Sequence, residues 1–243
     1  MFQPWTEIES FHNIKKFTSV YPDVVKGNKV QYKSKVKLHG TNAGVQCRMD
    51  GIIPQSRTTD LTVTSDNAGF ARWVTDTNAH WVAVRESAGK DIVIFGEWCG
   101  PGVQSNVAVC SIPKRSFVVF AARFIDEEDS FIADPQELSS LLGNIPDVYV
   151  LPWHSTVEVD WLMPESLNLV IDAINIDVLA VEEMDPYIYD TFGIKGTGEG
   201  LVYYPYGGHS TYHDFINLVF KAKGRGEVRR GAFPCREAQR DQQ

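Results

Sequence analysis

Three strand-like segments follow one another between Val30 and Arg57, and the short connections between them restrict how this chain can fold. The segments are VQYKSKVKL, NAGVQCRM and GIIPQSR, and a Met-Asp-Gly turn separates the last two. Short strands joined by turns of this kind are typical of antiparallel pairing. The pattern therefore predicts a mostly antiparallel sheet structure in this part of the chain.

Strand-like and helix-like segments alternate along the remaining sequence. Buried strands are predicted over DIVIFGEW (91–98) and SFVVFAARF (116–124). Helices are predicted before Lys29, along a stripe of Phe70, Trp73, Val74, Trp81, Val82 and Val84, from Pro135 to Gly143, and over 164–184. A glycine-rich loop is predicted to lead into a strand within 189–207, and a last strand over DFINLVFKAKG (214–224). Many short strands with a few helices predict an α+β fold of antiparallel sheets flanked by helices.

The composition is that of an ordinary globular protein, which we expect to form a single domain over residues 1–243. A formal net charge of −8 argues against simple electrostatic coating of nucleic acid. The charge is nevertheless uneven, because KAKGRGEVRR from Lys221 to Arg230 carries five basic residues against one glutamate. A phosphate-facing patch and a solvated tail both account for this stretch, and residues from about 225 to 243 are expected to form a basic C-terminal tail.

The cysteines and the apolar runs indicate where the protein resides. Four cysteines show neither metal-ligand spacing nor a dense disulfide pattern, so reduced thiols are expected. Residues 1–20 lack the apolar region of a secretory signal, and the longest apolar runs are too short to span a bilayer. We therefore expect a cytoplasmic or otherwise intracellular protein without a signal peptide or transmembrane segment.

The eight residues KVKLHGTN, from Lys35 to Asn42, place a lysine at a strand end that enters a glycine turn. The strand fixes the backbone of Lys37, and Gly40 lets a ligand approach closely. This is a suitable position for a reactive amine. The competing interpretation is a solvent-facing lysine at an ordinary hairpin bend, so the decision depends on the rest of the chain.

Four later segments supply groups that suit phosphoryl chemistry. They are Arg57 after the third strand, FGE ending at Glu97, EGLV beginning at Glu199, and the K-x-K pair Lys221 and Lys223 on one face of a strand. A lysine becomes a nucleophile when other cations crowd it, and the same cations neutralise charge developing on phosphate. Two carboxylates suit Mg²⁺ or a ribose hydroxyl, and an aromatic strand residue such as Phe120 suits a base. The set predicts attack of Lys37 on the α-phosphate of a nucleotide.

The motifs K-x-H-G-T-N, F-G-E, an aromatic strand, E-G-x-V and K-x-K occur in this order from about Lys35 to Lys223. In this order the chain resembles the covalent nucleotidyltransferase superfamily, and within it the ATP-dependent RNA ligases of the RNA ligase 2 family, which includes RNA-editing ligases. His39 makes the chain resemble the RNA ligase branch more than the other branches, since DNA ligases and capping enzymes generally carry K-x-D-G with an aspartate at this position. The resemblance implies an adenylation domain with an ATP-grasp-like cleft.

The resemblance also implies roles for individual residues. Lys37 would be the nucleophile that reacts with ATP to become lysyl-AMP, in the presence of Mg²⁺ or Mn²⁺. Lys221 and Lys223 would contact the α-phosphate and activate the nucleophile, and Glu199 would serve the metal or its water shell. The remaining ATP- or AMP-binding residues would be Leu38, His39 in the turn, Thr41 and Asn42 at the nucleotide or the RNA ends, Arg57 at phosphate or the 3′-OH strand, Glu97 at the ribose 2′-OH, and Phe120 on adenine.

The implied reaction joins RNA 3′-OH and 5′-phosphate ends, possibly in a nicked duplex, by enzyme adenylylation, AMP transfer to RNA and strand sealing. A DNA or mixed DNA/RNA end-joining ligase is an alternative. A weakly active RNA-end-binding subunit of a larger repair complex, working with an accessory RNA-binding protein, is another. Labelling with ATP and sealing assays on different polymers separate these alternatives.

Two departures from the family pattern bear on these expectations. Ala121 stands where an aspartate often follows the stacking aromatic, which weakens the assignment of Phe120. The separate C-terminal domain of the phage prototype is expected to be missing, with the basic stretch Arg225 to Arg230 or a partner protein compensating. Elsewhere, His209-x-x-x-His213 beside an aspartate permits a metal site, although a polar loop is the expected structure.

Overall fold

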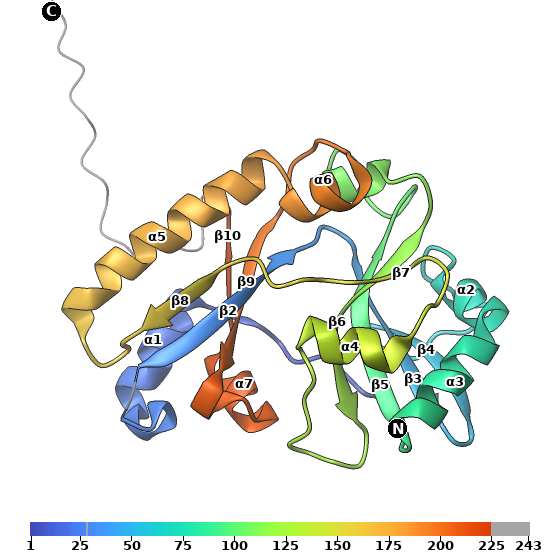
Figure 1. Cartoon of the computed structure of the whole chain (residues 1–243), viewed down its shortest axis with the longest axis horizontal. Helices are drawn as coiled ribbons and strands as arrows, with labels where there is room; N and C mark the ends of the chain where they lie inside the picture. Colours follow the sequence, from blue (N-terminus) through green and yellow to red (C-terminus); the bar gives the residue numbers. More distant parts are fainter. Residues whose placement is uncertain (28, 225–243) are drawn as a thin grey trace, which may run out of the picture.

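Two five-stranded sheets form the body of the computed structural model, which describes residues 1–27 and 29–224 (Figure 1). Sheet A has the order β1-β10-β9-β2-β8, and sheet B has the order β4-β3-β5-β6-β7. The strands of sheet A are β1 (Glu9–Ser10), β10 (Phe220–Lys223), β9 (Gly200–Tyr206), β2 (Val30–Lys37) and β8 (Thr156–Val159). The strands of sheet B are β4 (Gly51–Ser56), β3 (Thr41–Arg48), β5 (Ile92–Cys99), β6 (Ser116–Phe124) and β7 (Val148–Val150). Neighbours are antiparallel except in the parallel pairs β1–β10 and β6–β7.

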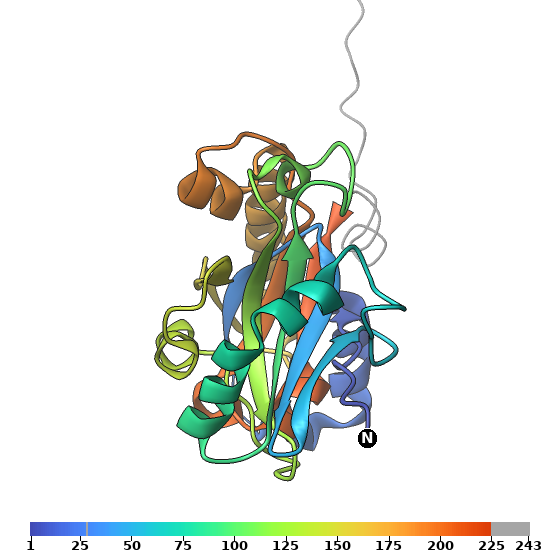
Figure 2. The ribbon, with the colours of Figure 1, turned by 90° about the vertical axis from the view of Figure 1, so that its right-hand side faces the viewer.

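Helices flank both sheets, which confirms the predicted α+β class. They are α1 (Phe11–Val20), α2 (Phe70–Asp76), α3 (Asn78–Ala88), α4 (Pro135–Leu142), α5 (Pro164–Glu183), α6 (Pro186–Phe192) and α7 (Tyr212–Leu218), with 3-10 turns η1 (Pro22–Val25), η2 (Ala108–Ser111) and η3 (Gly207–His209). The long helix α5 packs on β8, β9 and β10 of sheet A, whereas α2 and α3 cover sheet B (Figures 1 and 2). Among the described helices, none is long and apolar enough to cross a membrane.

The predicted hairpin between the first two strands does not form. Strand β2 belongs to sheet A and β3 to sheet B, so the residues from Leu38 to Gly40 carry the chain from one sheet to the other. The crossing is tight, because a Cβ at Gly40 would lie only 2.8 Å from the backbone oxygen of Trp98 and 2.9 Å from Cys99 Sγ. Lys37 therefore ends its strand at the junction of two sheets instead of at a solvent-facing bend.

Most of the other predicted elements are present, with three exceptions. The helix predicted along the stripe from Phe70 to Val84 is divided at Thr77 into α2 and α3, and Val82 is exposed. A short helix, α6, precedes the glycine-rich loop. The strand predicted over 214–224 is wrong for its first half, because Thr211 accepts a hydrogen bond from the backbone of Asp214 and thereby caps helix α7, so that only Phe220–Lys223 forms a strand.

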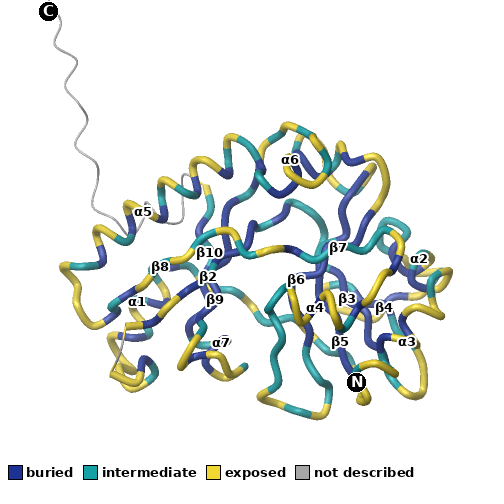
Figure 3. Tube along the Cα trace, viewed as in Figure 1, coloured by how far each residue is buried: buried dark blue, intermediate teal, exposed yellow. Residues whose placement is uncertain are grey.

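Many of the buried residues lie in the strands, as Figure 3 shows. One hydrophobic cluster draws residues from both sheets, including Val36 of sheet A and Phe95, Val118 and Phe120 of sheet B. A second cluster fills the space between sheet B and helices α2, α3 and α4. The shared first cluster fixes the two sheets against each other, and the end of β2 lies at this junction.

Gly200 is the one glycine in the described strands of sheet A, and we expect it to tolerate substitution poorly. Its φ of +142° is rarely adopted by other residues, and a Cβ there would lie 2.8 Å from Lys223 Cβ and closer still to the Ala222 backbone oxygen. We expect Gly200→Ala to lower the free energy of unfolding by about 2–4 kcal/mol, because it adds backbone strain to a steric clash. Urea unfolding followed by circular dichroism measures the change.

Gly208→Ala is the matched control, because a Cβ at Gly208 would meet nothing within 4 Å. It should change the free energy of unfolding by less than about 0.5 kcal/mol. Equal stability of the two variants would contradict this account of Gly200.

Candidate active site

Two lysines and one carboxylate meet where β2, β9 and β10 adjoin. Lys37 Nζ lies 2.6 Å from Glu199 Oε1, and Lys223 Nζ lies 3.1 Å from the same oxygen. The strand register explains this meeting, because Lys37 on β2 and Lys223 on β10 both pair with Gly200 on the strand between them. Paired residues share one face of a sheet, and Gly200 has no side chain to separate the two lysines. The cluster is only partly open to solvent, since 26%, 13% and 34% of the side chains of Lys37, Glu199 and Lys223 are exposed.

The charges of this cluster determine the protonation of its members. Burial raises the pKa of the Glu199 carboxyl, but the charges and hydrogen bonds of Lys37 and Lys223 outweigh burial and hold this pKa below its usual range. Burial lowers the pKa of His39; Glu199 opposes this effect, and the two lysines add to it. Glu199 is therefore ionised and His39 neutral near pH 7.

A pocket opens beside the cluster and draws its walls from both sheets. The predicted site residues that line it are Lys37, Leu38, Asn42, Arg57, Glu97, Phe120 and Lys221. Glu199 and Lys223 contact Lys37 or each other, so most of the predicted site residues lie in or beside this pocket. The arrangement offers positive charge at one wall and an aromatic ring at another, which suits a ligand with a phosphate and a flat base.

Glu97 occupies the sheet B side of the pocket beside Asn42. The two residues pair across β5 and β3, and their side chains are hydrogen-bonded. Burial raises the pKa of Glu97 to about 8 and Glu199 adds to the increase, whereas Lys37, Asn42 and Arg57 act against it. Glu97 is therefore mainly protonated at pH 7 and can donate as well as accept a hydrogen bond.

Two predicted residues, His39 and Thr41, are near the pocket without lining it. Thr41 pairs with Trp98, and its Oγ1 accepts a hydrogen bond of 3.3 Å from Asn67 Nδ2. His39 lies close enough to the cluster for its pKa to respond to Glu199 and the lysines. His39 belongs to the segment that joins the two sheets, and Thr41 begins β3 directly after it.

This geometry can be compared with that of known proteins. A family model described as RNA ligase matches residues 31–223. The chain belongs to the RNA ligase family. The matched span begins in β2 and ends at Lys223, so it contains the lysine–glutamate cluster and all but the N-terminal part of the pocket.

Solved structures of Naegleria gruberi RNA ligase share the fold of this RNA ligase family member. A mutant with ATP and Mn gives a TM-score of 0.61 at 19% identity, covering 95% of this chain and 57% of that one. A mutant with AMP and Mn gives 0.58 at 18% identity, covering 93% and 57% of the two chains. An apo mutant gives 0.58 at 16% identity, again covering 93% and 57%. The chain thus spans 57% of the length of these relatives.

The pocket of this RNA ligase family member also contains residues that the motifs did not reveal. They are Trp5, Thr6, Ile8, Lys35, Val36, Leu151, Val202 and Tyr204. Strand alternation offers a signal for Lys35, which shares a face with Lys37, and the E-G-x-V motif contains Val202. Trp5 has no such signal, because it reaches the pocket only through packing, with its ring 5.0 Å from that of Phe120.

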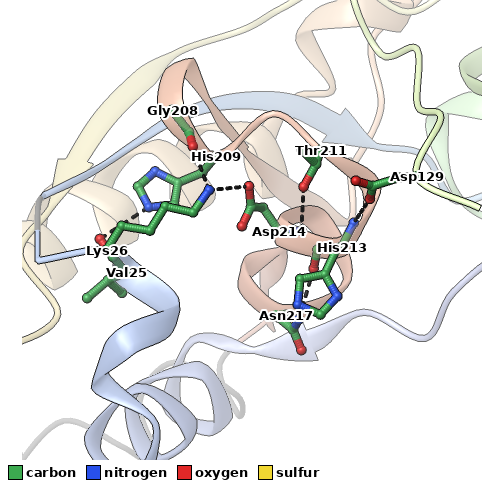
Figure 4. A network of polar contacts seen from close by, with 9 residues as sticks. All are labelled: Val25, Lys26, Asp129, Gly208, His209, Thr211, His213, Asp214 and Asn217. Carbon is green, nitrogen blue, oxygen red and sulfur yellow. Dashed lines mark hydrogen bonds and ion pairs between the residues drawn. The ribbon is translucent and has the colours of Figure 1, made fainter.

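His209 and His213 point to different partners and do not form a metal site (Figure 4). His209 is buried in η3, where its Nε2 lies 3.2 Å from the Val25 backbone oxygen, and His213 lies on helix α7 in place of the predicted polar loop. Lys26 Nζ contacts Asp214 Oδ2 at 2.8 Å in the same network. Across residues 1–27 and 29–224, no group of three or more His, Cys, Asp or Glu residues is arranged to hold a metal ion.

Glu97→Gln is expected to remove a pH-dependent loss of stability. The folded-state pKa of about 8 lies above the usual carboxyl value of about 4.3, so the wild type binds more protons when folded and loses stability as the pH rises between these values. The variant should match the wild type below about pH 5 and exceed its free energy of unfolding by on the order of 1 kcal/mol near pH 9, allowing for solvent screening. Urea unfolding across this pH range measures the difference.

Glu158→Gln on β8 serves as the control, because the Glu158 side chain is 48% exposed. Its stability should follow that of the wild type across the same pH range. Parallel curves for Glu97→Gln and the wild type would mean that Glu97 is already ionised at pH 7.

Proposed function

We propose that this protein is an ATP-dependent RNA ligase that joins 3′-OH and 5′-phosphate ends through lysyl-AMP and adenylylated RNA. The observation that carries the proposal is the position of Lys37, which lines the two-sheet pocket while contacting a carboxylate shared with a second lysine. Membership of the RNA ligase family supports it. So does the shared fold of Naegleria gruberi RNA ligase structures that contain ATP or AMP with Mn.

The first chemical step forms a bond from Lys37 Nζ to the α-phosphorus of ATP as the bond to the pyrophosphate oxygen breaks. Lys37 must lose a proton before attack, and Glu199 Oε1 at 2.6 Å is within reach of that proton. Lys223 Nζ lies 3.1 Å from the same carboxylate oxygen. Lys221 and Lys223 then offset the negative charge that develops at the α-phosphate.

The nucleoside is assigned to residues of the pocket. Phe120 stacks on adenine, and Leu38 provides apolar wall beside it. Glu97, protonated near pH 7, hydrogen-bonds the ribose 2′-OH. This assignment sets the base against sheet B and the reacting phosphate against sheet A.

Four further residues are assigned to phosphate, RNA ends or support of the site. Arg57 is exposed at the pocket and binds phosphate or the 3′-OH strand. Asn42 fixes Glu97 and contacts the nucleotide. His39 and Thr41 shape the segment that joins the two sheets, beside the nucleotide or the RNA ends.

Glu199 is the residue assigned to Mg²⁺ or Mn²⁺, directly or through water. Such a cation, when bound, would neutralise charge on the phosphates of ATP. The donor set fits, because Mg²⁺ bound beside phosphates usually takes only one or two protein carboxylates and keeps several waters. Glu199 is close enough to Glu97 for its charge to add to the raised pKa of the Glu97 carboxyl.

The proposed substrate is RNA with a 3′-OH and a 5′-phosphate end, including the two ends of a nicked duplex. AMP passes from Lys37 to the 5′-phosphate, and attack by the 3′-OH then seals the strand and expels AMP. We also propose that the described residues act as one adenylyltransferase domain, since the pocket needs both sheets. The basic stretch from Arg225 to Arg230, and the rest of the predicted tail over 225–243, lies outside the described residues. An accessory RNA-binding protein is a further possible partner.

Lys37→Ala should abolish covalent labelling of the protein by ATP, because it removes the attacking amine. We expect wild-type protein with Mg²⁺ or Mn²⁺ to acquire one AMP through an acid-labile, alkali-stable P–N bond, and the variant to lose more than about 1,000-fold of this activity. Radiolabelled ATP with denaturing gel electrophoresis measures the adduct, and mass spectrometry locates it. GTP should label the wild type poorly.

Lys33→Ala is the control, because Lys33 lies on the same face of β2 but beside Trp153 and Tyr206 instead of in the pocket. It should retain labelling. A wild type that stays unlabelled with either metal across neutral and alkaline pH would rule out the proposed chemistry.

Sealing of nicked duplexes should depend on RNA at the 3′-OH side of the nick. The assay compares RNA and DNA on that side, and includes looped and single-stranded RNA. We expect at least about tenfold faster sealing with RNA, a preference that corresponds to about 1.4 kcal/mol in the transition state. Equal rates with DNA would assign the protein to a mixed end-joining class, and labelling without multiple-turnover sealing would indicate a subunit of a larger complex.

A further inference from the structure

Lys35 carries an amine into the protein interior two residues before Lys37 on β2. Only 1% of Lys35 is exposed, although it lines the same pocket. Because strand residues two apart share a face, Lys35 and Lys37 both extend from sheet A towards the pocket. A buried ammonium group is costly unless it is well partnered, so its partners indicate why it is there.

The hydrogen-bond acceptors of Lys35 lie on β6 of sheet B and in the segment that follows β6. Lys35 Nζ donates hydrogen bonds of 2.8 Å to the Phe120 backbone oxygen and 2.6 Å to the Ala133 backbone oxygen. The aromatic rings of Trp153 and Tyr204 lie 4.6 and 5.5 Å from the same nitrogen. A single side chain therefore connects the nucleophile-bearing strand of sheet A to the strand of sheet B that carries the base-stacking residue.

Phe120 needs such a connection because it lies at an irregularity in β6. Gly96 pairs with Val119 and Phe95 with Ala121, so the register between β5 and β6 passes over Phe120. Every other residue of β6 has a partner on β5. A bulge of this kind leaves one residue unpaired and redirects its side chain, and such bulges are frequent beside active sites. The Phe120 carbonyl is the group that Lys35 binds.

We propose that Lys35 is a positioning residue of the nucleotide site, which fixes the Phe120 bulge so that the base-stacking ring and the Lys37 amine keep a set separation. The inference rests on the proposed function, in which Phe120 holds adenine and Lys37 attacks the α-phosphate. Lys35 can set the distance between the Lys37 amine and the Phe120 ring, because it shares β2 with Lys37 and binds the backbone oxygen of Phe120. It touches neither the phosphate nor the base in this role.

Stability alone does not explain a lysine at this position. Burial lowers the pKa of Lys35 to about 7, and the charge of Asp134 opposes this decrease only in part. A lysine whose folded-state pKa is below its unfolded value of about 10.4 reduces the stability of the fold, fully below about pH 7 and less as the pH approaches 10. A methionine would fill similar space without this cost.

ATP affinity measures the positioning role without depending on turnover. Calorimetric titration of ATP with Mg²⁺, carried out on full-length protein in the Lys37→Ala background, compares Lys35→Met with the control Lys33→Met. We expect Lys35→Met to weaken ATP binding about tenfold while the melting temperature stays the same or rises. Lys33→Met should leave the affinity unchanged, because Lys33 lies outside the pocket.

A double-mutant cycle with Phe120→Leu tests whether Lys35 acts through Phe120. In the Phe120→Leu background, Lys35→Met should weaken ATP binding less than about threefold, since the ring that it positions is already absent. Lys35→Gln, which can still donate to one carbonyl, should give an intermediate affinity and replaces Lys35→Met if that variant fails to fold.

Unchanged affinity in Lys35→Met, or an equal loss in both backgrounds, would overturn the inference. A melting temperature that falls in parallel with affinity, with no dependence on Phe120, would assign Lys35 a structural role and overturn it as well. Failure of the proposed function would look different: the wild type would bind ATP in a manner dependent on Lys35 and yet form no lysyl-AMP.

Discussion

The site depends on one carboxylate oxygen that two lysines share. Glu199 Oε1 contacts Lys37 and Lys223 at the same time, and this is possible only because Gly200 separates their two strands without a side chain. Two ammonium groups repel each other, so the negative charge between them is what lets both remain at one end of sheet A. The pKa of Glu199 is low because the two lysines stabilise its ionised form.

The two sheets contribute different chemistry to the pocket. Sheet A supplies three lysines to the pocket, whereas sheet B supplies the Phe120 ring and the Glu97 carboxyl, which stays protonated near pH 7. Arg57, which follows β4 of sheet B, adds a cation from that side. Neither sheet alone presents both the three lysines and the Phe120 ring to the pocket. The direct connections between the sheets therefore matter as much as the groups themselves: the segment from Leu38 to Gly40, the packing of Trp5 on Phe120, and the hydrogen bonds of Lys35.

Much of the candidate site could be predicted from the sequence because motif order and strand alternation are local properties. Lys37 at a strand end and the K-x-K pair on one strand face follow from spacing alone. Which strands share a sheet does not follow from spacing. The hairpin bend considered for Lys37 does not form, because β2 pairs with the distant strands β8 and β9 whereas β3 pairs with β4 and β5. Helix α7 was missed because its capping by Thr211 was not recognised.

The distribution of strands along the chain has a consequence for the order in which the protein assembles. All of sheet B lies between residues 41 and 150, whereas sheet A takes strands from residues 9–10, 30–37, 156–159, 200–206 and 220–223. Sheet B can therefore form while the chain is still being synthesised, but sheet A must wait for its latest strand. Because β10 carries Lys223, the cluster of Lys37, Glu199 and Lys223 is complete only at the end of this sequence of events. A chain that ends before β10 therefore lacks the complete lysine–glutamate cluster, and the slow, long-range pairing of sheet A is the step that completes it.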